Sequence, residues 1–88
     1  FVLEQSSSFA ESLLREKNLT DEQRLDLAYK KAMGRSITAA ETTKLLNYIK
    51  SYETRLPATI TDAAVRHEKA WTSACQVIFA SNEFIYLN

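Results

Sequence analysis

One stretch decides the fold: residues 20–34, Thr-Asp-Glu-Gln-Arg-Leu-Asp-Leu-Ala-Tyr-Lys-Lys-Ala-Met-Gly. Thr20 and Gln23 have the spacing of a capping box, which begins many α-helices. Gly34 suits the left-handed residue that often follows the last turn of a helix. Apolar residues recur between these ends at helical intervals and would form one buried face. That face comprises Leu25, Ala28, Tyr29, Ala32 and Met33. The stretch therefore predicts one complete amphipathic helix.

A weaker helix precedes this one, over about residues 3–17. Its first half contains a serine run, and serine competes for backbone hydrogen bonds. Asn18 follows as the expected left-handed stop. The apolar stripe consists of Val2, Phe9, Leu13 and Leu14.

A third helix follows and is again marked by its ends. Thr38 and Glu41 form a second capping box. The helix is expected to end before Pro57, because proline disfavours helical geometry in the residue before it. Residues 57–61 then form a connector. The buried face is expected to contain Leu45, Leu46, Ile49, Tyr52 and Leu56.

The fourth helix is expected to begin at Thr61 or Asp62 and to continue to about Phe79. Ser81 is expected to cap one last short turn. The following tail, residues 85–87, is expected to be extended, either packed across the bundle or trimmed from a longer element. One face of the helix contains Ala64, Trp71, Ala74, Cys75, Ile78 and Phe79. The sequence therefore predicts an all-α fold, a compact four-helix domain with short turns and a packed C-terminal tail.

The length fits a single helical domain, residues 1–88, which we expect to be excised from a longer protein because Phe1 opens an apolar phrase. Eleven basic and eleven acidic residues cancel. No basic stripe is visible in the sequence, so we expect no nucleic-acid binding and no attraction to an anionic membrane surface. No apolar run approaches the roughly 18 residues that cross a bilayer, so we also expect no membrane insertion.

Residue types that often carry catalysis are sparse. His67 and Cys75 lie eight positions apart on one predicted helix. That spacing is about 12 Å along the helix axis, too far for a nucleophile–base pair. A single cysteine also excludes an internal disulfide and a multi-cysteine zinc or c-type haem site within these residues. We therefore expect no catalytic, metal-binding or cofactor-binding residues, an edge position for His67 and a buried, inert thiol at Cys75.

The carboxylates are explained by their places on the predicted helices. Glu41 and Asp62 lie at helix starts, where capping accounts for them. No two carboxylates mark a cleft of the kind that a glycosidase needs. Polar helix faces account for Glu11, Glu16, Glu22 and Asp26.

Arg35 and Glu83 form a candidate structural pair. Arg35 directly follows the glycine that ends the second helix, and Glu83 lies between apolar stretches, where a half-buried carboxylate needs a partner. The guanidinium fork of Arg35 suits a carboxylate. The alternative is that Glu83 bonds to backbone amides of its own turn while Arg35 is solvated. Tyr48 lies off the main stripe of its helix and is the best candidate for a surface contact.

Three phrases of the chain resemble one known family. They are Phe1-Val2-Leu3-Glu4-Gln5, the turn between Ala32 and Glu41, and the closing phrase between Trp71 and Asn88. Together they are similar to the planctomycete PSD domain, a domain of unknown function near the C-terminus of large planctomycete proteins. Met33 stands where that family usually has leucine, and Ala80 stands where it usually has asparagine.

The resemblance implies a C-terminal segment of an exported protein, periplasmic or at the cell surface, whose upstream parts often carry cytochrome-like haem-binding segments. The family has no established catalytic residues to transfer. We therefore expect a non-catalytic structural or interaction module whose partners are other domains of the parent protein, with self-association through the first helix or the tail. The alternative is an accessory part of an enzyme, for example polysaccharide-processing or haem-linked redox, whose chemistry lies in upstream domains.

Overall fold

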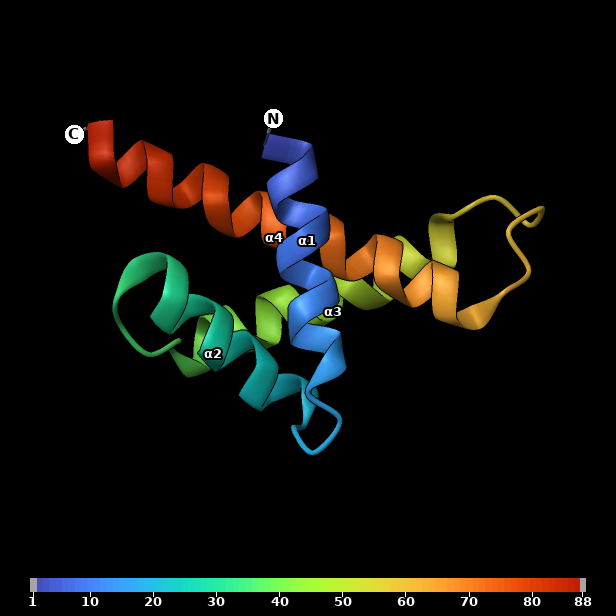
Figure 1. Ribbon diagram of the computed structural model, residues 1–88, viewed down its shortest axis with the longest axis horizontal. Helices are drawn as coiled ribbons and strands as arrows, with labels where there is room; N and C mark the ends of the chain where they lie inside the picture. The colour runs from blue at the N-terminus through green and yellow to red at the C-terminus, as the bar shows by residue number, and fades with distance from the viewer. Residues whose placement is uncertain (1, 88) are drawn as a thin grey trace.

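The computed structural model describes the backbone of residues 2–87 and the side chains of residues 8–81. Over the described backbone it contains four helices and no strand, which confirms the all-α prediction (Figure 1). The helices are α1 (Val2–Arg15), α2 (Asp21–Met33), α3 (Ala39–Arg55) and α4 (Ala63–Leu87). None of the described helices combines the length and apolarity needed to cross a membrane.

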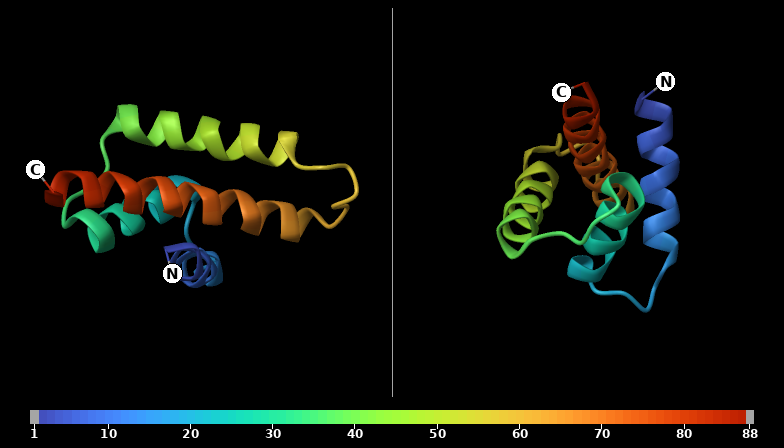
Figure 2. Two further views of the ribbon diagram at one scale, coloured as in Figure 1. Left: turned by 90° about the horizontal axis from the view of Figure 1, so that it is seen from above. Right: turned by 90° about the vertical axis from the view of Figure 1, so that its left-hand side faces the viewer.

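Helix α4 is the centre of the domain, because it contacts each of the other three helices. Helix α3 runs alongside α4, whereas α1 crosses α4 steeply on the opposite side (Figure 2). Helix α2 fills the space between α1 and α3. Within the described part of the chain, α1 and α3 do not contact each other. One side of α4 therefore belongs to α1 and the other side to α3.

The core forms where the apolar stripes of the four helices meet on α4. Ala10 of α1 and the two α4 residues Ala70 and Ala74 are all fully buried in the same cluster. Between α1 and α4, the rings of Phe9 and Phe79 stack with centroids 5.3 Å apart. The core residues with the clearest helical spacing are confirmed as buried, namely Leu25, Tyr29, Leu45, Ile49, Trp71, Cys75 and Ile78.

Both predicted capping boxes are present. The Thr20 hydroxyl accepts the backbone N–H of Gln23, and the Gln23 side chain accepts the backbone N–H of Thr20. Thr38 and Glu41 make the same reciprocal bonds at the start of α3. Gly34 ends α2 with a φ of 73°, which side chains with a Cβ rarely adopt. The ends of α2 are therefore determined locally, as the sequence predicts.

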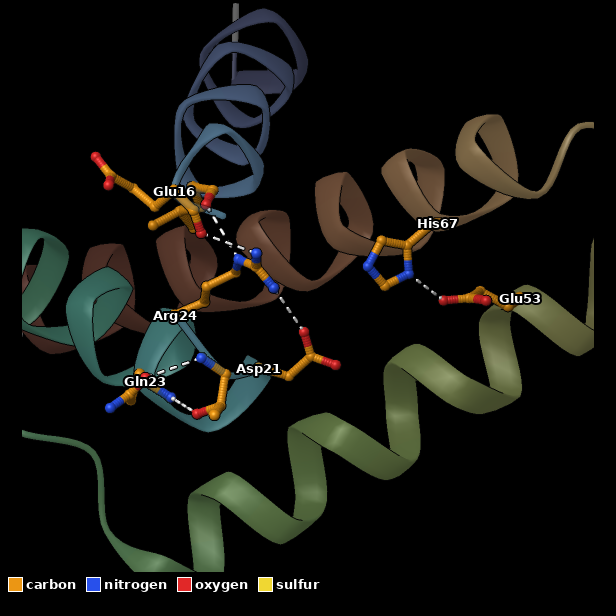
Figure 3. A network of polar contacts seen from close by, with 8 residues as sticks. Glu16, Asp21, Gln23, Arg24, Glu53 and His67 are labelled. Carbon is orange, nitrogen blue, oxygen red and sulfur yellow. Dashed lines mark hydrogen bonds and ion pairs between the residues drawn. The ribbon is translucent and has the colours of Figure 1, made fainter. Parts of the chain in front are cut away.

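The left-handed stop predicted at Asn18 is wrong, since Gly34 is the only described residue with a positive φ. Helix α1 ends at Arg15, and an arginine from α2 donates to one carbonyl in its last turn and to one just beyond its end. The Arg24 Nε donates to the Leu13 carbonyl at 3.2 Å, and its Nη2 donates to the Glu16 carbonyl at 2.8 Å (Figure 3). Because this long-range cap replaces a local one, the sequence around Asn18 carries little sign of it.

The short turn at Ser81 and the extended tail over residues 85–87 are also wrong, because α4 continues as a helix to Leu87. No glycine or proline follows Pro57, so the sequence contains no strong helix breaker in this region. The start of α4 agrees with the prediction, since the Asp62 carboxylate accepts the backbone N–H of Ala64 at 2.9 Å. The side chains that the packed-tail prediction concerns lie outside the described residues.

Candidate functional site

Two open grooves follow the seam between α3 and α4. The Tyr48 groove has a volume of about 480 Å³ and is lined mainly by Glu41, Lys44, Leu45, Tyr48, Val77 and Ser81. The Tyr52 groove has a volume of about 370 Å³, and its walls include Tyr52, Leu56, Ile60, Glu68, Thr72 and Gln76. Together the two grooves are called the α3–α4 seam below.

The sequence of α4 explains why this side of the helix is open. Ser73, Val77 and Ser81 are spaced four residues apart and therefore lie along one line of the helix. All three have short side chains and line the seam. The facing residues of α3 include the much larger Tyr48 and Tyr52. Short side chains opposite large rings leave space that neither helix fills.

Tyr48 is held at the boundary between the two grooves. Its hydroxyl is hydrogen-bonded to the Ser73 hydroxyl on α4, and its ring centroid is 6.1 Å from that of Tyr52. Tyr48 is nevertheless 37% exposed, and Val77 in the same groove is 39% exposed. The prediction that Tyr48 lies at the surface is confirmed, and its role as a contact stays a prediction. The ring is an aromatic side chain fixed in place but accessible to solvent.

Arg35, predicted as a partner of Glu83, binds Glu41. Its Nη1 and Nη2 donate to the two Glu41 carboxylate oxygens at 2.9 and 2.8 Å, and its guanidinium lies 5.2 Å from the ring centroid of Tyr29. The side chain of Glu83 lies outside the described residues. The bidentate bond of Arg35 therefore ties the turn between α2 and α3 to the first turn of α3.

The electrostatic setting of Glu41 decides what it can do in the Tyr48 groove. Arg35, and then the backbone N–H of Thr38, lower the pKa of the Glu41 carboxyl to about 2. Glu41 is therefore ionised at neutral pH and unsuited to act as a general acid there. Glu68 lines the other groove. With one carboxylate in each, neither groove offers a converging acid–base pair.

Arg66 fixes the far end of the Tyr52 groove. Its guanidinium donates to the carbonyls of Pro57 and Ile60 at 2.9 and 2.8 Å, and also to the carbonyls of Glu53 and Leu56. Leu56 and Ile60 are themselves lining residues of that groove. Arg66 therefore holds the loop between α3 and α4 in the shape that the groove requires.

His67 and Cys75 occupy the places expected of them. The His67 side chain is 38% exposed at the edge of the core, and its Nδ1 lies 2.8 Å from a Glu53 carboxylate oxygen (Figure 3). Cys75 is fully buried, and burial raises the pKa of its thiol to about 12. Such a thiol is protonated and inaccessible, unlike a catalytic nucleophile. Among the described residues, no three His, Cys, Asp or Glu side chains gather as a metal ion requires.

Sequence reasoning missed two features that build the seam. The first is Arg66, which donates to backbone carbonyls. Every residue type has such a carbonyl, so no sequence motif predicts these bonds. The second is the line of Ser73, Val77 and Ser81 on α4. Their four-residue spacing was a readable signal, because it places a stripe of short side chains directly beside the buried stripe of the same helix.

The chain matches no family model, no curated protein and no solved structure. The resemblance to the planctomycete PSD domain therefore stays a prediction, and the geometry of the α3–α4 seam carries the functional argument.

Proposed function

We propose that this domain is a non-catalytic interaction module and that the α3–α4 seam is its docking surface. The observation that carries the proposal is the pairing of Tyr48 and Val77, both exposed, within one groove. A fixed aromatic ring with a polar tip supplies contact area at little entropic cost, and tyrosine is enriched among the residues that dominate interface energies. The bond to Ser73 holds the Tyr48 ring in one orientation before any partner binds.

The resemblance to the planctomycete PSD domain supplies the proposed context. In this proposal the domain is a C-terminal segment of a larger exported protein, and its seam docks against another domain of that protein. The self-association expected through the first helix or the tail rests on the apolar side chains of residues 1–3 and of the tail, which lie outside the described residues. That expectation is separate from docking through the seam.

The alternative proposal is an accessory part of an enzyme, completed at the interface with another domain. The observation in its favour is that Tyr48 and Glu41 line the same groove. Against it, both oxygens of the Glu41 carboxylate are already bonded to Arg35, which keeps the group ionised. We therefore favour the interaction module.

Two valines with matched exposure provide the test. Val65 and Val77 are both on α4 and both 39% exposed, but Val65 lines neither groove of the seam. Val77→Asp should release the domain from its docking site in the full-length protein, because a charge enters a desolvated contact. Limited proteolysis should then cleave around the domain faster than in the wild type.

Val65→Asp serves as the matched control and should leave the cleavage rate unchanged. Circular dichroism of the isolated variants checks that both remain folded. Equal cleavage rates for the two folded variants would contradict docking through the seam.

A further inference from the structure

The described side chains that line the α3–α4 seam carry a small excess of positive charge. Lys44 lines the Tyr48 groove, Lys69 lines the Tyr52 groove, and both side chains are exposed. Among the described residues, no carboxylate lies within 4.0 Å of either lysine. They are therefore available to a partner.

The acidic residues around the seam are mostly committed to internal bonds. Glu41 is bound by Arg35, and Glu53 lies against His67. Glu68 in the Tyr52 groove is the remaining carboxylate on the seam itself. With the Glu41–Arg35 pair counted as neutral, Lys44 and Lys69 against Glu68 leave the described lining of the seam with one excess positive charge, although the formal net charge of the whole chain is +0.

The two lysines lie in different grooves of the seam. Lys44 lines the Tyr48 groove from α3, and Lys69 lines the Tyr52 groove from α4. Tyr48 lies at the boundary between the grooves, where its hydroxyl is hydrogen-bonded to Ser73. The seam therefore has an exposed ring near its centre and one lysine in each groove.

We propose that the occupant of the seam is an acidic amphipathic helix of another protein segment. Its apolar face packs on Tyr48 and Val77, and its carboxylates meet Lys44 and Lys69. This inference rests on the proposed docking function and adds the chemistry of the partner. An amphipathic helix laid into an apolar groove is a recurring mode of recognition, and complementary charges at the rim orient the partner and speed its association.

A polyanion such as nucleic acid fits the same surface less well. Nucleic acid carries about one charge per 1.7 Å of duplex and is bound through dense cationic contacts. The seam has a few scattered cations around apolar side chains, among them Leu56 and Ile60. Apolar walls of this kind favour apolar side chains over phosphates.

The test uses two designed peptides of roughly 14 residues, four helical turns each. Both have leucine at the same helical spacing, and the flanking positions are glutamate in one peptide and lysine in the other. Each is titrated into the isotopically labelled 88-residue chain while amide chemical shifts are recorded. The glutamate peptide should shift the signals around Tyr48 and Val77 and should bind at least about tenfold more tightly than the lysine peptide. Its affinity should fall as salt is added.

Charge reversal on the protein locates the effect. The double variant Lys44→Glu and Lys69→Glu should reverse the preference, so that the lysine peptide binds more tightly. The control double variant Lys17→Glu and Lys50→Glu makes the same change in net charge at exposed lysines that line neither groove. The control should keep the preference for the glutamate peptide. If the first double variant is unfolded by circular dichroism, the milder Lys44→Gln and Lys69→Gln variant should abolish the preference.

Four results would overturn the proposal: equal binding of the two peptides, an unchanged preference after charge reversal at the seam, tighter binding of a single-stranded oligonucleotide there, or seam signals that shift with protein concentration alone. The last would identify a second copy of the chain as the occupant. The proteolysis test on Val77 does not depend on the partner's charge. If the proteolysis test confirms docking but the two peptides bind equally well, only the proposal that the partner is an acidic helix is contradicted.

Discussion

The two sides of α4 are packed differently. On the α1 side, the ring of Phe79 stacks on Phe9 of the crossing helix with centroids 5.3 Å apart, and Leu13 of that helix is fully buried. On the α3 side, Val77 is exposed and lines an open groove together with Tyr48. Helix α4 contributes a large ring in the first case and a short side chain in the second. The α1 side is therefore closed, whereas a short side chain beside a large ring leaves the α3 side open.

The largest effect should come from the closed side. Leu13 of α1 is fully buried, and Leu13→Ala should lower the free energy of unfolding by about 2–5 kcal/mol, because it removes buried methyl groups and leaves a cavity. Val77→Ala on the open side should change it by only about 0.5 kcal/mol or less. Urea denaturation of the two variants compares them directly. Similar losses would mean that the two sides of α4 do not differ as described.

The next effect should come from the loop that shapes the open side. Arg66→Gln removes donors to four backbone carbonyls and should cost about 2 kcal/mol of stability. Hydrogen exchange should speed up at the backbone amide of Ile60, which is bonded to the Pro57 carbonyl within this loop. Arg55→Gln, which changes an exposed arginine on the neighbouring helix, is the control and should have little effect on either quantity. An unchanged rate of hydrogen exchange at Ile60 in Arg66→Gln would contradict the claim that Arg66 anchors the loop between α3 and α4.

A smaller, pH-dependent effect should come from Glu41 at the start of α3. Its folded pKa of about 2 lies below the ordinary value of 4.5, chiefly because Arg35 binds the ionised form. The resulting stabilisation is present above about pH 4.5 and is lost as the pH falls towards 2. Urea midpoints between pH 6 and about 2.5 should therefore fall less steeply in Glu41→Gln than in the wild type. Glu22→Gln, at an exposed position in the first turn of α2, should keep the wild-type slope. An equally steep fall in Glu41→Gln would contradict the assignment.

A small effect should also come from the hydrogen bond that fixes the exposed ring. Tyr48→Phe keeps the ring but loses the hydrogen bond to Ser73, and should cost about 0.5–1.5 kcal/mol. Tyr52→Phe is the matched control on the same helix, since the described residues provide no hydrogen bond to the Tyr52 hydroxyl. Urea denaturation should show a lower free energy of unfolding only for Tyr48→Phe. Equal stabilities would mean that the Tyr48 hydroxyl does not fix the ring.

Local sequence signals predicted most of this fold, whereas the contacts between distant residues could not be predicted from the sequence. The capping boxes at Thr20 and Thr38 and the left-handed Gly34 depend on residues within one turn, so the sequence displays them openly. The end of α1 depends on Arg24, and the loop before α4 depends on Arg66. Both arginines bind carbonyls far along the chain, where any residue type supplies the acceptor. The sequence therefore cannot reveal these bonds before the helices are placed.

The same distinction applies to the seam. Exposure of Tyr48 followed from its place on one helix, because the buried stripe of α3 lies to one side of it. The grooves, by contrast, depend on how Ser73 and Val77 of α4 face α3, which is a property of two helices together. The bond between Arg35 and Glu41 is a second example. The sequence explained Glu41 by helix capping alone, and its bond to Arg35 depends on how the turn before α3 folds.

Oxidative footprinting tests the docking surface most directly. Hydroxyl radicals label exposed side chains, so labelling is measured at Tyr48, Val77 and Val65 in the isolated chain and in the full-length protein of which it is proposed to be a segment. All three are exposed in the isolated chain, with exposed fractions of 37%, 39% and 39% respectively. Docking through the α3–α4 seam predicts that labelling of Tyr48 and Val77 falls sharply in the full-length protein while that of Val65 stays the same. Unchanged labelling at Tyr48 and Val77, or an equal fall at all three, would contradict it.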